Sequence, residues 1–501
     1  MKLRYWGVCI LVLMVFVLSA LAFPAASGQA QGGILPTPTP FPVDNLEYDV
    51  TTVGGSPETL TYDHPDQDGF VLGQTTVTSE YPRGMVFTLA PTSPNGEITE
   101  ITLFLRYVHG SGTRVQAEWD EAAGQWIAHP WATGEGQPAW THFDFTWRVR
   151  DETGAAVDTE PIAADYSDPT REWFRMESPE IIVYWTGFST SNPDWFGSTA
   201  AEAVAATTPR KIAGFGEPIS YKSIAVIYGS REMMNEMYGS GISDETAGGF
   251  TSSDLGISVQ YAPYASDDAS NIEWLSHVIT HELTHLYQYD LMGGNQGPNW
   301  WVEGSADWFA IRPYQYDARL MNLATMQDIP SLTEQVTRNM VQADGRPYLV
   351  YDMGASFINW LNMNYGGIDT IRQIIAQMQA GVDVYEAIEQ ATGKLFIDLQ
   401  NEWRIYLGYE PLDLADIDPA AALQPAVDPL FEVGDTVTLP PSPPLPGIYE
   451  NPGPDELYTG QCFANTAVEI LQVGSLDGVD YYQVDCMGQI GWMTRDQLVG
   501  E

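Results

Sequence analysis

The stretch "VITHELTHLYQY", residues 278–289, places two of the chain's seven histidines four residues apart, with a glutamate directly after the first. Apolar residues recur around it at helical spacing, which predicts a helix over residues 271–290. Residues four apart lie about 40° from each other around a helix axis, so His281 and His285 face the same way. Two such imidazoles can hold one Zn²⁺, and Glu282 can accept a proton from water beside it. The competing interpretation is a helix with two ordinary, hydrogen-bonded histidines.

The ends of this helix carry recognisable signals. Ser270 and Glu273 have the S-x-x-E spacing of a capping box, which predicts where the helix begins. Gly293 and Gly294 supply the stop. We therefore expect a regular helix with both histidines well inside it.

A second segment, "PNWWVEGSADWFAIRP" (298–313), strengthens the metal interpretation. It predicts another helix, and Glu303 within it follows His285 by 18 residues. The small residues after Glu303 would let the two helices approach closely, so that its carboxylate reaches the metal. Asp307 lies one turn further on, where it can accept a hydrogen bond from a ligand imidazole and fix its tautomer. The alternative for Asp307 is an ordinary surface residue of the helix.

The pair "HELTH" and "WVEGSADW" resembles the gluzincin (HExxH…E) zinc metallopeptidases, most closely their peptidase-MA-like branch, over about residues 180–408. That resemblance implies an α+β catalytic domain that hydrolyses peptide bonds. It also implies that His281, His285 and Glu303 are the zinc ligands and that Glu282 is the general base.

A peptidase also needs a group that stabilises the oxyanion. The stretch "VYDMGASFINWL" is similar to an aminopeptidase-family segment in which a tyrosine donates to the oxyanion. The resemblance implies this role for Tyr351, and Tyr348 is the second candidate. A tyrosine that simply packs at a helix start is the other interpretation.

Two further expectations concern the substrate. In related enzymes an edge strand before the active helix pairs with extended substrate backbone, and we expect that strand within Gly248–Tyr261. The Gly-x-Met-Glu-Asn segment, whose glutamate binds a free amine in aminopeptidases, has no match here, which favours an endopeptidase.

His277 precedes His281 by four residues and completes a ladder of three histidines. A fourth protein ligand would close a site that catalysis needs open. We therefore expect His277 to be a partly buried neighbour of the site, or a group that supports a ligand, and exclude it from the metal ligands.

The N-terminus has the pattern of a signal peptide over residues 1–30, with basic Lys2 and Arg4 before a long apolar run. Secretion or another extracytoplasmic location is expected, and an uncleaved membrane anchor is the alternative. Cys9 lies too early for lipoprotein attachment. Residues 31–47 form a Pro-rich linker. No later stretch has the length and apolarity of a membrane span.

Short alternating runs over residues 48–177 predict a β-sandwich-like domain. Residues 178–410 predict an α+β catalytic domain with strands first and helices after. An acidic linker follows over residues 411–430. The fold class is thus multidomain. Four histidines of the β-rich region lack metal-ligand spacing and are assigned no role: His64, His109, His129 and His142.

Residues 431–501 resemble a bacterial SH3-like domain, through segments such as "VGDTVTL" and "QIGWMTRDQLV". The resemblance implies a small β-barrel and a possible cell-wall or surface ligand. Cys462 and Cys486 are an even pair close in sequence in an exported chain, which predicts one disulfide bond.

Acidic residues outnumber basic ones 66 to 21, for a formal net charge of −45. Such a chain is repelled by phosphate backbones and anionic membranes, so nucleic-acid binding is disfavoured. Carboxylate clusters such as Asp267 and Asp268 could collect Ca²⁺. A solvated acidic surface is the simpler interpretation of each cluster.

Three hypotheses follow. The first is an exported zinc metallopeptidase, an endopeptidase acting on peptides or proteins. The second is a secreted cell-surface or cell-wall binding protein whose zinc site is structural or vestigial. The third, a cell-wall-degrading enzyme, draws only on the SH3-like segment.

Overall fold

The computed structural model describes most of the chain after residue 48. The described ranges are 49–56, 58–131, 137–187, 194–238, 249–262, 268–293, 296–311, 316–325, 328–333, 349–412, 426, 429–439, 447–449, 458–461, 466–476, 479–486 and 489–499. The predicted signal peptide and most of the predicted Pro-rich and acidic linkers lie outside them. No helix in these ranges has the length and apolarity needed to cross a bilayer.

The chain divides into two compact units. The first consists of Met1–Gly297, Trp301–Tyr314 and Leu361–Ala387. The second consists of Pro298–Trp300, Gln315–Trp360 and Ile388–Glu501.

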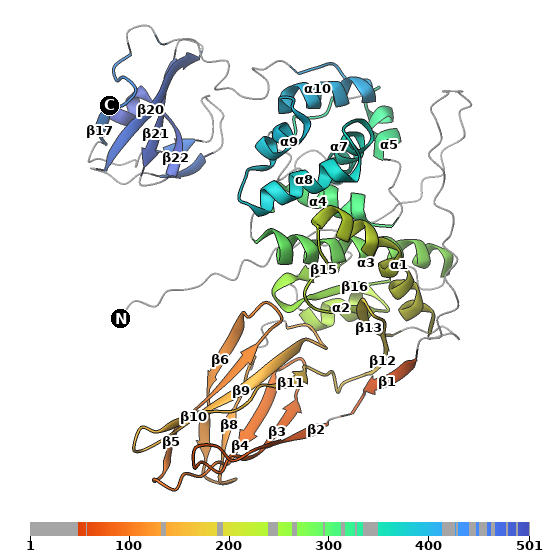
Figure 1. Ribbon diagram of the computed structural model, residues 1–501, viewed down its shortest axis with the longest axis vertical. Coiled ribbons are helices and arrows are strands. Elements are labelled where there is room, and N and C mark those ends of the chain that lie inside the picture. Colours follow the sequence, from red (N-terminus) through yellow and green to blue (C-terminus); the bar gives the residue numbers. More distant parts are fainter. Residues whose placement is uncertain are drawn as a thin grey trace. The chain divides into compact units, whose positions relative to one another are not determined.

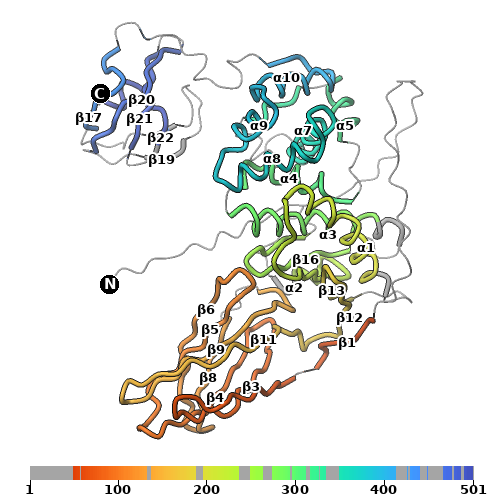
Figure 2. Tube along the Cα trace, viewed as in Figure 1, coloured from red at the N-terminus to blue at the C-terminus, as the bar shows by residue number. Residues whose placement is uncertain are grey.

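Two five-stranded antiparallel sheets form the N-terminal part of the first unit (Figures 1 and 2). One contains β2 (Thr59–His64), β3 (Gly73–Ser79), β4 (Met85–Leu89), β7 (Glu118–Asp120) and β8 (Gln125–Ala128). The other contains β5 (Ile98–Arg106), β6 (Gly112–Gln116), β9 (His142–Asp151), β10 (Ala156–Asp158) and β11 (Ile162–Asp165). Alternating burial along β9 sends Phe143, Phe145 and Trp147 inward. Phe87 of the facing sheet contacts all three rings.

A third, six-stranded sheet in the same unit supports the helix that carries His281 and His285. Its order is β1-β12-β13-β14-β16-β15, and β13, β14 and β16 run parallel. The strands are β1 (Val50–Gly54), β12 (Glu172–Glu177), β13 (Ile181–Thr186), β14 (Ser223–Tyr228), β15 (Gly249–Ser252) and β16 (Ile257–Tyr261). Because β1 and β12 precede residue 178, the boundary expected there cuts through this sheet. Within the described residues β15 pairs with β16 alone, so it is the edge strand of the region 248–261.

The first unit contains the helices α1 (Asp194–Phe215), α2 (Arg231–Tyr238), the short η1 (Ser253–Leu255), α3 (Asp268–Met292), most of α4 (Asn299–Phe309) and α8 (Ile368–Gln379). Helices α1, α2, η1 and α3 of the first unit contact this sheet, and α8 packs against α1 and α3 (Figure 1). The expected order, strands first and helices after, is wrong, because α1 connects the parallel strands β13 and β14. Parallel neighbours need such a crossover.

Helix α3 also begins earlier than expected. Its first residue is Asp268, so Ser270 lies inside the first turn and is not the predicted cap.

The second unit contains α5 (Tyr316–Leu323), most of α7 (Leu349–Asn364), most of α9 (Val384–Thr392) and α10 (Phe396–Leu407). The guanidinium of Arg404, which is 1% exposed, donates to Asp328 and to the backbone oxygen of Ile329. Trp403 packs its ring against Phe357. These contacts tie α10 to α7 and to the segment around residue 328.

The C-terminal residues of the second unit form a six-stranded antiparallel sheet with its own apolar core. Its order is β17-β20-β21-β22-β18-β19. The elements are β17 (Thr436–Thr438), β18 (Gly447–Tyr449), β19 (Tyr458–Gln461), β20 (Ala467–Leu476), β21 (Val479–Cys486), β22 (Gln489–Thr494) and the helix α11 (Arg495–Val499). The SH3-like assignment of this region stays a prediction.

Candidate metal centre

Three ligand-type atoms from two helices converge in the first unit. Helix α3 carries His281 and His285, whose Nε2 atoms lie 3.1 Å apart. Helix α4 carries Glu303, whose Oε2 lies 3.5 Å from Nε2 of His281 and 3.7 Å from Nε2 of His285. The structure therefore brings together the three residues that the sequence nominated as ligands.

The size of this triangle matches a zinc ion. Zinc bonds to nitrogen and oxygen are about 2.0–2.2 Å long and tetrahedrally arranged, which places neighbouring ligand atoms about 3.3–3.5 Å apart. The three edges here, 3.1, 3.5 and 3.7 Å, bracket that spacing. One ion can bind all three atoms with only small side-chain adjustments.

The outer nitrogens of both imidazoles have acceptor partners. Nδ1 of His281 lies 2.7 Å from Oδ1 of Asp307, and Nδ1 of His285 lies 2.7 Å from Oε1 of Gln288. The Gln288 amide is oriented by its own donors, because its Nε2 donates to Ser305 and to the backbone oxygen of Val302. Each Nδ1 therefore carries a proton. With both rings neutral, two Nε2 lone pairs and a carboxylate oxygen face one another, an arrangement that needs a cation.

The carboxylates of the cluster are buried, which strengthens the requirement for a cation. Glu282 and Asp307 are 0% exposed and Glu303 is 6% exposed. None of the described lysines and arginines forms an ion pair with these three carboxylates. Among the described residues, Oε2 of Glu303 and Oε1 of Glu282 also lack a hydrogen-bond partner. Buried charges are costly unless they are paired or bind a metal, so the donor set fits a divalent cation.

The pKa values of the two imidazoles are driven apart. Burial opposes the charged form of His281, but the hydrogen bond and charge of Asp307, together with Glu303 and Glu282, outweigh it and raise the pKa of His281 to about 10. Burial lowers the pKa of His285 to about 3, and the charge of His281 adds to the effect. The surroundings therefore favour one positive charge at this pair: a proton on Nε2 of His281 supplies it without a metal, and a bound cation would replace that proton.

The carboxyl groups diverge as well. Burial raises the pKa of Glu303 to about 7. Burial acts in the same direction on Asp307, but its polar contacts with His277 and His281 and the charges of these two rings together outweigh burial and lower the pKa of Asp307. Asp307 is therefore the fixed anion of the cluster.

Glu282 lies beside the metal ligands with one carboxylate oxygen held. Its Oε2 accepts a hydrogen bond from the hydroxyl of Thr251 on the edge strand β15, while Oε1 has no hydrogen-bond partner in the described part of the chain. Burial raises the pKa of this carboxyl group. The arrangement leaves one basic oxygen available to a water molecule.

Sequence reasoning missed two supporting residues, Thr251 and Gln288. Gln288 follows His285 by three residues on the same helix, and this spacing places the two side chains on one face. That signal could have identified it. Thr251 is separated from Glu282 by a strand and a turn, and nothing in its local sequence links the two.

The roles of the other nominated residues stay predictions. Tyr351 is buried in the first turn of α7 and belongs to the second unit, so its role stays a prediction. Cys486 is buried at the end of β21, but Cys462 lies outside the described residues. The same holds for Tyr348, Asp267 and the side chain of Asp268, so the disulfide and the calcium site also stay predictions.

Comparisons with known proteins add little. No protein-family model and no curated protein matches the sequence. Among the solved structures that the chain resembles is one described as the crystal structure of Legionella pneumophila aminopeptidase A in complex with aspartic acid, at 10% identity and a TM-score of 0.30. The match covers 71% of this chain and 50% of that chain, so this chain spans half the length of that protein. A likeness at this level carries no functional argument.

Proposed function

We propose that this chain is an exported zinc-dependent peptidase that cleaves internal peptide bonds. The observation that carries the proposal is the convergence of His281, His285 and Glu303 on one point, with the unpartnered oxygen of Glu282 beside it. Zinc held by three protein ligands supplies Lewis-acid chemistry, which makes water acidic near neutral pH and polarises a carbonyl group.

The protein's own groups then have distinct tasks. Glu282 takes a proton from the attacking water through Oε1 and returns it to the leaving amine. Thr251 holds Oε2 and so fixes the direction in which Oε1 points. Asp307 keeps His281 in the tautomer that presents Nε2. Tyr351 is the proposed donor to the oxyanion, a role that rests on the family resemblance.

Substrate binding is assigned to the edge strand β15. Its outer edge carries no partner strand among the described residues, and Thr251 of this strand contacts the proposed base. An extended peptide that pairs with β15 would therefore lie close to Glu282. The missing amine-binding segment favours internal bonds, and the SH3-like segment would hold the enzyme near a cell-wall or surface ligand.

The test compares the wild-type protein with Glu282→Gln. Both should contain about one zinc per chain by elemental analysis, because Glu282 is not a ligand. The wild type should hydrolyse casein in a chelator-sensitive way, and the variant should lose at least about two orders of magnitude, the usual scale for a lost general base. Zinc without proteolysis in the wild type would instead support the secreted binding protein with a structural zinc site.

A further inference from the structure

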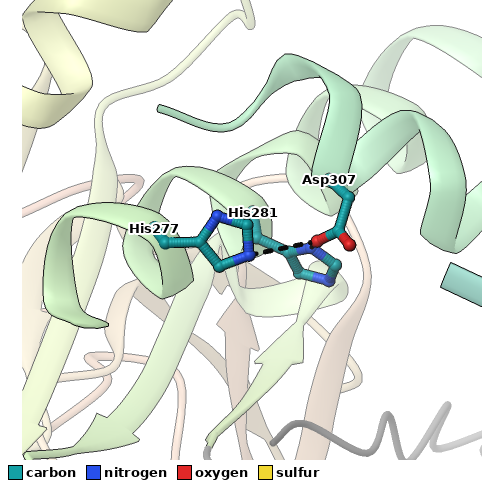
Figure 3. Close-up of side chains that lie close together, drawn as sticks. All are labelled: His277, His281 and Asp307. Carbon is teal, nitrogen blue, oxygen red and sulfur yellow. Dashed lines mark hydrogen bonds and ion pairs between the residues drawn. The ribbon is translucent and has the colours of Figure 1, made fainter. Parts of the chain in front are cut away.

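One oxygen of Asp307 joins two histidines of helix α3. Oδ1 of Asp307 lies 2.7 Å from Nδ1 of His281 and 3.2 Å from Nε2 of His277 (Figure 3). Asp307 is 0% exposed, His281 is 1% exposed and His277 is 2% exposed. His277 and His281 are one helical turn apart on α3, and Asp307 approaches them from α4. The three side chains thus form a buried chain that ends at the proposed metal ligand.

This group is not a second metal site. Ligand atoms around a tetrahedral zinc lie about 3.3–3.5 Å apart, and the 2.7 Å contact between His281 and Asp307 is too short for that. The distance is that of a charge-assisted hydrogen bond. His277 is also set apart from the ligand pair, because its ring centre lies 6.0 Å from that of His281, whereas the rings of His281 and His285 are 4.8 Å apart.

We propose that His277 is a positioning residue that acts on the metal through Asp307 and His281. Its Nε2 lies at ion-pair distance from Oδ1 of Asp307, and this contact stops the carboxylate from rotating away from His281. The carboxylate in turn fixes the ring of His281, so that Nε2 points at the metal. The inference rests on the proposed zinc site, and it assigns a task to the third member of the histidine ladder.

The test measures zinc affinity, by competition with a chromogenic chelator, and requires no peptidase activity. His277→Phe keeps a ring of similar volume and removes the donor. We expect it to weaken zinc binding about 3- to 10-fold, less than the 10- to 100-fold typical of a group that touches a ligand directly. His277→Gln can place an amide N–H near the position of Nε2 and should stay within about twofold of the wild type.

A double-mutant cycle separates positioning from general damage to the fold. In an Asp307→Ala background, His277→Phe should cause no further loss of zinc affinity, because its route to the metal is already cut. Equal losses in both backgrounds would overturn the proposal, as would wild-type affinity in His277→Phe or an equal loss in His277→Gln. A wild-type chain that binds no zinc would overturn the proposed function as well, whereas the other outcomes leave that function intact.

Discussion

At the scale of single residues, side chains one turn apart on the same helix have different pKa values and roles because they have different hydrogen-bond partners. His281 is held by a carboxylate and His285 by an amide, so their pKa values move in opposite directions although the two rings are one turn apart. Glu282, next to His281 in sequence, is held by the hydroxyl of Thr251. The partner of His285 comes from α3 itself, that of His281 from α4, and that of Glu282 from β15. Each of the three residues therefore has its own role.

A substitution of Thr251 tests the orientation of the base. Thr251→Val keeps the shape of the side chain and removes the hydroxyl, so Oε2 of Glu282 loses its donor. We expect kcat/KM for peptide hydrolysis to fall about tenfold, at the low end of the range for general-base effects, with zinc content unchanged. Thr251→Ser keeps the hydroxyl and is the matched control. If Val and Ser variants have equal activity, the hydroxyl does not orient Glu282.

At the scale of elements, α1 supports α4 from the side. A Cβ added at Gly214 of α1 would lie 2.4 Å from Cζ of Phe309, so only glycine allows this close approach. Nearby, Lys211 is 0% exposed and donates to Thr207 and to the backbone oxygen of Phe309, the last residue of α4. A cation at this end suits the helix dipole. The contacts fix the end of the helix that carries Glu303 and Asp307.

Lys211 makes stability depend on pH. Burial lowers its pKa well below 10.5, and the charge of Arg210 adds to the effect. The unfolded chain therefore binds more protons between the lowered pKa and 10.5, so the contribution of Lys211 to stability rises with pH in that window. Relative to Lys211→Met, the Tm of the wild type should increase as the pH is raised from about 7 towards about 10. A constant Tm difference between the two proteins would show that Lys211 stays charged in the fold.

Sequence patterns predicted the parts of the site whose residues lie close together in the sequence. The spacing within 281–285 and the segment around Glu303 led to the two helices that meet at the cluster, because helical periodicity and metal-ligand spacing are both short-range. Helix α1 was missed as a crossover because its residues carry little amphipathic contrast and a proline, Pro209. The part that Thr251 plays depends on sheet pairing that brings β15 beside α3, and no local pattern encodes that contact.

At the scale of the whole molecule, the chain combines a strongly acidic composition with a cluster of buried carboxylates. Its formal net charge of −45 is spread over a surface where water solvates most acids. Glu282, Glu303 and Asp307 lack that solvation. A bound divalent cation would compensate part of their charge and should stabilise the folded first unit.

Removal of the metal should therefore lower thermal stability. A cation that binds only the folded state stabilises it by about 2.7 kcal/mol at a hundredfold excess over its Kd. We expect a chelator to lower the Tm of the wild type by several degrees, and added Zn²⁺ to restore it. Glu303→Gln, which weakens the site but keeps its volume, should show a much smaller shift. Equal shifts in both proteins would place the stabilising metal elsewhere.

X-ray absorption at the zinc edge tests the central claim most directly. We predict one zinc per chain, bound by two imidazole nitrogens and a carboxylate oxygen at about 2.0–2.2 Å, with one further light atom that does not come from the protein. Replacing His281 or His285 with alanine should remove one imidazole signal. A spectrum with sulfur ligands, with four protein ligands, or with no imidazole would contradict the account.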